Sequence, residues 1–104
     1  MTRVANAARG EAVIHTNNAA LMLRPTFAAL IAAEEELGPL FALVERAASG
    51  ALKLSEMVAL FWHCLGEQSA VTRDEFAEAV VDAGLAAATP ALKILLGQIL
   101  GGRP

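Results

Sequence analysis

The hydrophobic period of the chain changes at Pro25-Thr26, from two residues before this point to 3.6 residues after it. Before it, the runs EAVIHT and AALMLR flank Asn17-Asn18, a pair whose tolerance of positive φ suits a tight hairpin turn. An isolated hairpin is only marginally stable in water. We therefore predict an antiparallel β-hairpin over about residues 11–24 that packs on the helices after it.

Thr26 is a candidate N-cap, and after it apolar residues recur at helical spacing. The predicted apolar stripes of the five helices comprise Phe27, Leu30, Ile31 and Leu37; Leu40, Leu43, Val44 and Ala47; Met57, Val58, Leu60, Phe61, Cys64 and Leu65; Phe76, Ala77, Val80 and Val81; and Leu92, Leu95, Leu96, Ile99 and Leu100. Gly38-Pro39 ends the first helical segment, and Thr72–Glu75 forms a capping box that opens the fourth. Thr89-Pro90 supplies a cap and a first residue for the last helix; the alternative is an earlier start at Leu85 with a bend at Pro90. The predicted helices cover about residues 26–37, 39–49, 55–65, 72–83 and 89–100. The chain is thus predicted to be one α+β domain over 1–104, a hairpin packed on four or five short helices.

Composition excludes several classes of protein. The 104 residues are 56% hydrophobic, carry a net charge of −3 and have a mean hydropathy of +0.50, which is unlike a disordered chain. The longest stretch without a charged side chain, Ala12–Leu23, has 12 residues, too few to span a bilayer, and no signal peptide precedes it. A pI near 5.3 without a basic block excludes nucleic-acid binding, and a single cysteine is typical of a reducing compartment. We expect a soluble, cytoplasmic protein.

No residue pattern for catalysis, a cofactor or a metal is present. His63 and Cys64 are adjacent, but neighbouring helical residues point about 100° apart, so we interpret Cys64 as a small core residue. His15 has no second His or Cys at ligand spacing. Phosphate-binding loops, nucleophile elbows and zinc motifs are absent from the sequence. We therefore predict no enzyme, no cofactor and no metal site.

The acidic residues are interpreted as solvated. Residues 55–84 resemble a helix–loop–helix calcium site, but the intervening loop, 66–71, lacks the alternating Asp/Asn ligands and central Gly that calcium requires. Asp74, Glu78 and Asp82 follow one another at intervals of four, opposite the apolar stripe of their helix. This spacing predicts a solvent-exposed helix face.

Glu34, in the run Glu34–Glu36, is different because it falls on the apolar stripe of its helix. A carboxylate in that position needs a donor or a path to water. Two interpretations stay open: Glu34 accepts hydrogen bonds from backbone N–H groups of the hairpin, or it faces a partner.

The chain offers more apolar side chains than a core of this size easily buries, among them Phe41, Phe61 and Trp62. Trp62 points off the main stripe of its helix and is either a second-layer core residue or a contact for another protein. The last helix has an apolar arc wider than one packing partner needs, so part of it should stay exposed and bind a partner or a second copy. The predicted partner-binding residues are Trp62, Leu92, Leu96, Ile99 and Leu100.

The order and spacing of several short segments resemble the gene transfer agent family, whose small phage tail proteins are also classed as tail assembly chaperones. The resemblance covers about residues 9–102. It is carried by Arg9-Gly10-Glu11, Leu23-Arg24-Pro25-Thr26-Phe27 with Ala29-Leu30, Glu34, Leu37-Gly38, Gly50, Leu54-Ser55 and Gly84-Leu85 before a Leu-rich tail.

The resemblance implies a non-enzymatic role in assembling a phage-like tail. It implies a chaperone that covers the long, apolar, helical tape-measure protein until tube subunits replace it, with the tape-measure protein and the tail tube protein as partners. Two alternatives remain: a structural component of the tail, or a small helical adaptor for protein interactions. The family is also described as a tube protein; because tube rings are built on large sheets and this chain has one short hairpin, the sequence disfavours that description.

Overall fold

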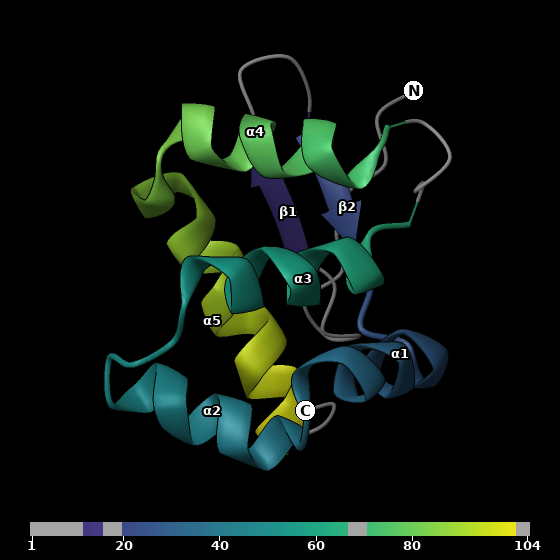
Figure 1. Ribbon diagram of the computed structural model, residues 1–104, viewed down its shortest axis with the longest axis vertical. Helices are drawn as coiled ribbons and strands as arrows, with labels where there is room; N and C mark the ends of the chain where they lie inside the picture. The colour runs from purple at the N-terminus through teal and green to yellow at the C-terminus, as the bar shows by residue number, and fades with distance from the viewer. Residues whose placement is uncertain (1–11, 16–19, 67–70, 102–104) are drawn as a thin grey trace.

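The computed structural model describes residues 12–15, 20–66 and 71–101, and it has the predicted α+β fold (Figure 1). A two-stranded antiparallel hairpin precedes the helices. The elements in chain order are β1 (Ala12–His15), β2 (Ala20–Leu23), α1 (Phe27–Leu37), α2 (Leu40–Ala48), α3 (Leu54–Cys64), α4 (Arg73–Ala83) and α5 (Leu85–Gly101).

The hairpin pairs Ala12 with Leu23 and His15 with Ala20. The predicted Asn17-Asn18 turn lies outside the described residues. The C-terminal end of β2 forms backbone contacts with the C-terminal end of α3. Arg24 N–H donates to the Cys64 carbonyl at 2.7 Å, and Leu23 forms an isolated β-bridge with Leu65. The hairpin is therefore supported by a helix terminus as well as by side-chain packing, as a two-stranded unit requires.

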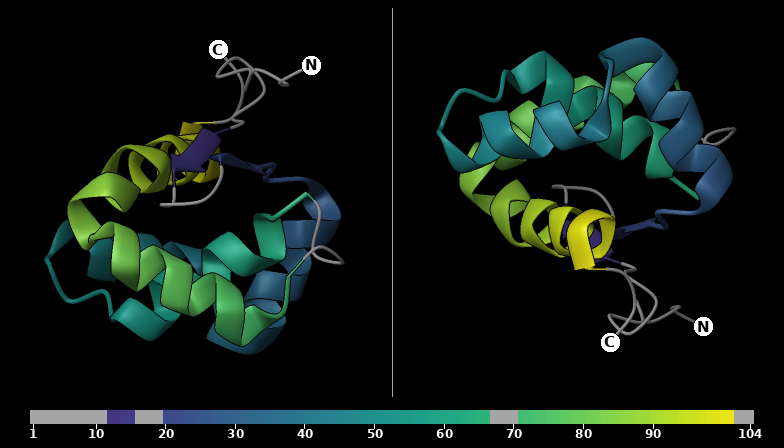
Figure 2. Two further views of the ribbon diagram at one scale, coloured as in Figure 1. Left: turned by 90° about the horizontal axis from the view of Figure 1, so that it is seen from above. Right: turned by 90° about the horizontal axis from the view of Figure 1, so that it is seen from below.

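The elements form two layers (Figure 2). Helix α5 lies side by side with β1 on one side of the molecule, and α1, α2, α3 and α4 lie on the other side. Helix α3 packs against both α1 and α4 in that second layer. The core lies between the layers, where the buried side chains of Ile14, Phe61, Phe76 and Leu95 come together.

Helix ends agree with the sequence signals within one residue, except for α5. The Thr26 hydroxyl accepts from Ala29 N–H at 3.1 Å at the start of α1. The capping box of α4 is formed: Thr72 accepts from Glu75 N–H at 3.1 Å, and the Glu75 carboxylate accepts from Thr72 N–H at 2.8 Å. These bonds also hold the pKa of Glu75 below its ordinary value.

The last helix begins at Leu85, as the alternative prediction had it, and not four residues later at Thr89. Pro90 is therefore inside the helix instead of at its first position. The Thr89 hydroxyl donates to the Leu85 carbonyl at 3.2 Å, so it does not cap the helix. The preceding residues, Ala86–Ala88, are the strongest helix formers, and the missing N–H of Pro90 removes one helical hydrogen bond, the one to the Ala86 carbonyl. Local helix propensity therefore outweighs the cap signal.

The predicted apolar stripes are largely buried, with two corrections. In α1, Phe27 and Ile31 are exposed, and the buried face instead centres on Ala33. In α4, Phe76 is buried but Val81 is exposed. Both errors have one cause: helical spacing gives the relative angle of side chains but not which flank of the stripe a neighbouring element covers.

Candidate partner-binding surface

The five predicted partner-binding residues do not share one exposed surface. Leu100 is 59% exposed. The side chains of Leu92, Leu96 and Ile99 are half-buried and pack against the core. Trp62 is also half-buried, and its ring lies 6.1 Å from the ring of Phe76 in a tilted arrangement. Of its two interpretations, the structure therefore supports a second-layer core residue that retains some accessible surface.

Other apolar side chains are more exposed than the predicted ones. Phe27 is 81% exposed and Phe41 is 73% exposed, although Phe61 is fully buried. Exposed apolar side chains indicate a contact surface where they are contiguous, whereas single ones are common on protein surfaces. The large exposed apolar side chains of the described residues are Phe27, Ile31, Phe41, Leu54, Val81, Leu85, Ile94 and Leu100.

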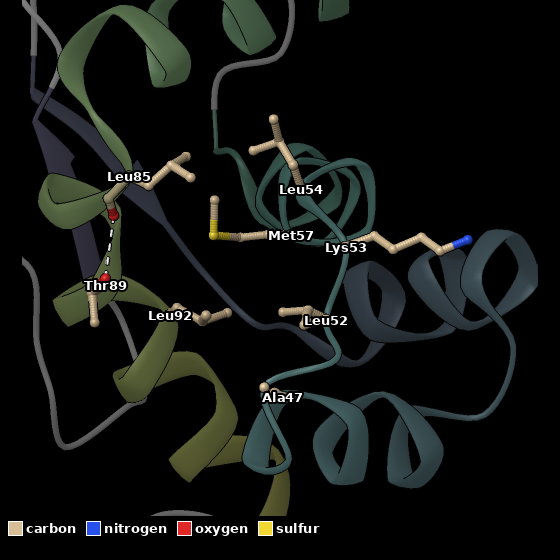
Figure 3. A pocket seen from close by; sticks show the side chains of 9 residues that line it. Ala47, Leu52, Lys53, Leu54, Met57, Leu85, Thr89 and Leu92 are labelled. Carbon is tan, nitrogen blue, oxygen red and sulfur yellow. Dashed lines mark hydrogen bonds between the residues drawn. The ribbon is translucent and has the colours of Figure 1, made fainter.

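A pocket of about 210 Å³ lies where the α2–α3 connection faces the first half of α5 (Figure 3). Leu92 projects into it from α5 toward Leu52, and Met57 projects from α3 between Leu54 and Leu85. Lys53 is the charged residue of the lining, and its side chain points away from the cavity (Figure 3). Ala47, Gly50 and Thr89 complete the lining.

This pocket is not predictable from the sequence, although Leu92 is one of the predicted contact residues. Its walls come from residues up to 45 positions apart, from Ala47 to Leu92. A usable signal was Leu85, an apolar residue directly after the helix stop Gly84. The Gly84 φ of 93° allows α4 and α5 to meet at a sharp corner, which brings Leu85 to the rim.

The charged side chains tie helices together. Glu36 on α1 accepts hydrogen bonds from the two terminal guanidinium nitrogens of Arg73 on α4, from Nη1 at 2.8 Å and from Nη2, and its Oε1 lies 2.8 Å from His63 Nε2 on α3. The hydrogen bond from Arg73 has the largest effect on the pKa of Glu36, and the contact with His63 has the second largest. Together these partners lower that pKa from 4.5 to about 2. The cluster therefore joins three helices at a partly exposed site.

Arg46 on α2 forms a second tie, an ion pair with Glu56 on α3. Glu56 also accepts from the backbone N–H of Lys53 at 3.0 Å, at the start of α3. The bond from Lys53 and the ion pair both hold the pKa of Glu56 below its ordinary value. Because both ties fix helices against each other, we interpret these charges as structural.

Glu34 is satisfied inside the domain. Its Oε2 accepts from Leu40 N–H at 3.1 Å, the first residue of α2, and not from the hairpin backbone. The carboxylate therefore caps the next helix across the Gly38-Pro39 turn, where Pro39 has no side chain that could do so. This bond corrects the interpretation that Glu34 accepts from the hairpin backbone, because its donor belongs to α2.

Cys64 is buried, and burial raises the pKa of its thiol to about 12, so it is a neutral core residue as predicted. The neighbouring His63 side chain points to Glu36. His15 lies exposed at the end of β1.

Within residues 12–15, 20–66 and 71–101, no group of three or more His, Cys, Asp or Glu side chains could hold a metal ion. Asp74, Glu78 and Asp82 are exposed, as their spacing predicts, whereas the loop tested for calcium ligands lies mostly outside the described residues.

In the described part of the chain, no single helix combines the length and the apolar character that a membrane span needs. Helices α4 and α5 meet the length and composition criteria only as a pair, and they are bent by 113° relative to each other.

Residues 9–102 match the protein family described as phage tail tube protein, GTA-gp10. The match covers nearly the whole chain. The chain belongs to this family. The GTA-gp10 family is a structural, non-enzymatic one, so the protein is a component of a phage-like tail system. Its family description specifies a tube protein and not an assembly chaperone. Comparisons with curated proteins and with solved structures give no match.

Proposed function

We propose that this GTA-gp10 family protein is a tail assembly chaperone that binds an apolar helical segment of the tape-measure protein. The proposal rests on a contrast between the small β-hairpin and the apolar helix surface. The described hairpin has two strands of four residues each, and it already packs on α5 and on the end of α3. The helices, in contrast, present large exposed apolar side chains, which suit transient binding of another apolar helix.

The C-terminal half of α5 is the surface we propose for this contact. Leu100 provides an exposed anchor, and the half-buried Leu96 lies one turn before it on the same side of the helix. Ile99 is a further half-buried apolar side chain in this half of the helix. Half-buried residues around one exposed anchor give a partner helix a preformed apolar surface.

A structural subunit of the finished tail is the second candidate function, and the family description as a tube protein favours it. In that case the exposed apolar side chains would contact neighbouring subunits. Mass spectrometry of purified particles separates the two candidates. Absence from mature tails, together with co-purification with the tape-measure protein before tube assembly, is the result expected for a chaperone. Stoichiometric presence in mature tails would overturn the chaperone proposal.

Leu100→Ser tests the proposed surface. Because Leu100 is exposed, the variant should keep the fold, as circular dichroism can verify, and weaken binding to purified tape-measure segments by about tenfold. Val81→Ser is the matched control, an exposed apolar side chain on α4 that should leave binding unchanged. If Leu100→Ser stays folded and binds as the parent does, the contact lies elsewhere on the chain.

A further inference from the structure

We infer that the corner between α4 and α5 is a hinge, and that two copies of the chain exchange their α5 helices when it opens. In the opened form, α4 and α5 become one continuous helix over residues 73–101. The α5 part of each copy then packs in the place that α5 of the other copy has left. This exchange does not depend on the proposed function. Three features carry it: the conformation of Gly84, the helix ends at the corner, and the kind of contact that holds α5.

Gly84 is the residue between α4 and α5, and its conformation makes the corner. Its φ of 93° and ψ of 144° belong to a region that essentially only glycine adopts. The two helices that meet there are bent by 113° relative to each other (Figure 1). A Cβ atom added at Gly84 would meet nothing within 4 Å. The corner therefore depends on the backbone of one residue and not on close packing around it.

Gly38 offers a comparison within the same chain. It lies between α1 and α2, and its φ of 83° and ψ of −169° belong to the same glycine-only region. Pro39 follows it, however, and a proline has no N–H to donate and disfavours helical conformation in the residue before it. A straight helix through Gly38-Pro39 is therefore strongly disfavoured. Gly84 is followed by Leu85 and three alanines, which continue a helix readily.

The corner interrupts helical hydrogen bonds that a straight helix would restore. At the corner, Gly84 N–H donates to the Val81 carbonyl and Ala87 N–H donates to the Gly84 carbonyl, each over 3.1 Å and three residues. In the described part of the chain, no side chain accepts from the first N–H groups of α5, since the Thr89 hydroxyl donates to the Leu85 carbonyl. In a continuous helix these N–H groups would donate to carbonyls of the last turn of α4.

Helix α5 is held on its own chain by apolar contacts. Among the described residues, its hydrogen bonds stay within the helix or at the corner, and no ion pair joins it to another element. Helix α4, in contrast, is tied to α1 by the ion pair of Arg73 with Glu36.

Helix α5 can therefore leave its chain without breaking an ion pair, but its apolar face must be covered again. Ala88, Ala91 and Leu95 are buried, and α5 contacts β1, α2 and α4. The surface that fits these side chains is the one that α5 already covers, and a second copy supplies the same surface when its own α5 leaves. Exchange of an identical element is a low-cost route to a dimer because the same contacts form again.

The variant Gly84→Ala tests the hinge. Alanine is strained at the corner and favoured in a continuous helix, so the substitution should favour the exchanged dimer. The strain corresponds to a factor of about ten for each chain, so the dimer with two hinges should form about a hundredfold more tightly than in the parent. Sedimentation equilibrium measures this change as a rise in average mass above the 10.8 kDa of one chain.

Gly38→Ala is the matched control. It introduces the same kind of strain into a corner where a Cβ atom also meets nothing within 4 Å. The variant should lose stability in urea denaturation and yet associate as the parent does, because Pro39 prevents the straight helix that would relieve the strain. A Gly38→Ala chain that dimerises as tightly as Gly84→Ala would overturn the inference.

Spin labels distinguish an exchanged dimer from an ordinary one. Glu78→Cys and Gly97→Cys place one label on each helix at exposed positions, whereas the native Cys64 is buried. At 1.5 Å per residue, the two positions lie about 28 Å apart in a straight helix, and closer together in the bent form. Labelled Gly84→Ala chains refolded with an excess of unlabelled ones should show the longer distance in the dimer fraction.

Two further outcomes would overturn the inference: a folded Gly84→Ala chain that stays monomeric at millimolar concentration, and a dimer that keeps the shorter distance. If Gly84→Ala does not fold, the doubly labelled parent is refolded from urea at millimolar concentration. It should then give a dimer fraction with the longer distance, and refolding to monomer alone would contradict the exchange.

Discussion

At the scale of single residues, several charged side chains pair with residues that are far away in the sequence, and local sequence patterns do not show such pairs. Glu36 belongs to an acidic run that the sequence analysis did not distinguish from a solvated face. Its partners His63 and Arg73 lie 27 and 37 positions away. Spacing along one helix cannot reveal a contact between three helices, because that contact depends on how α1, α3 and α4 pack. Cys64, by contrast, was correctly predicted as a core residue because its burial follows from the stripe of its own helix.

We predict that Glu36→Gln lowers the stability of the domain in a pH-dependent way. The pKa of Glu36 is about 2 in the folded chain and near 4.5 when unpaired, so its pairing stabilises the fold above pH 4.5 and is lost as the pH falls toward 2. Because the carboxylate is 37% exposed and screened by solvent, we expect a loss of only about 0.5–1 kcal/mol at pH 7.

Urea denaturation of parent and variant at pH 7 and near pH 2 measures this difference. The two curves should approach each other at the lower pH, where the parent carboxyl is becoming neutral as well. Glu35→Gln is the control, since Glu35 is the exposed neighbour of Glu36. An equal loss in Glu36→Gln at both pH values would show that the cluster does not stabilise the fold through charge.

At the scale of elements, the local signals gave four helices to within a residue at each end. Thr26 and Thr72 act as the predicted caps because a hydroxyl before a helix meets its free N–H groups whatever the tertiary fold. For α5 the structure shows the alternative start at Leu85 and not the start at Thr89, which fits a cap equally well in sequence. The α2 cap was unpredictable for the opposite reason: its acceptor, Glu34, lies in the preceding helix.

We predict that Glu34→Ala destabilises the domain by about 1 kcal/mol, because α2 loses the acceptor of its first N–H group. Glu34→Gln retains an oxygen acceptor and should lose less. Thermal unfolding followed by circular dichroism measures this loss. The midpoint temperature should fall in the order parent, Glu34→Gln, Glu34→Ala. Glu35→Ala, at the next position of the same helix, should remain close to the parent. If the Gln and Ala variants lose equal stability, the hydrogen bond to Leu40 is not the source of the effect.

At the scale of the whole molecule, the two layers explain which apolar predictions succeeded. All the predicted stripe residues of α3 are buried, because α3 has neighbours on two sides in its layer and lies opposite α5 and the hairpin. Helices α1 and α4 lie at the edges of that layer, so one flank of each stripe stays exposed, at Phe27 and at Val81. The candidate surface was predictable only where it lies on a single helix, as at Leu100. The pocket was not predictable, because its lining comes from α2, α3, α5 and the α2–α3 connection.

Helix α5 contributes to both the core and the surface, and substitutions along it should separate the two roles. Leu95 is fully buried between the layers, so Leu95→Ala should cost about 2–5 kcal/mol through lost burial and the cavity left behind. That is a large part of the stability of a small domain. Leu100→Ala removes the same atoms from an exposed position of the same helix and should change stability by no more than about 0.5 kcal/mol. Urea denaturation of both variants measures the contrast. A loss below about 1 kcal/mol for Leu95→Ala would mean that α5 and the hairpin unfold apart from the other layer, and the pocket between the layers would then not persist as a rigid site.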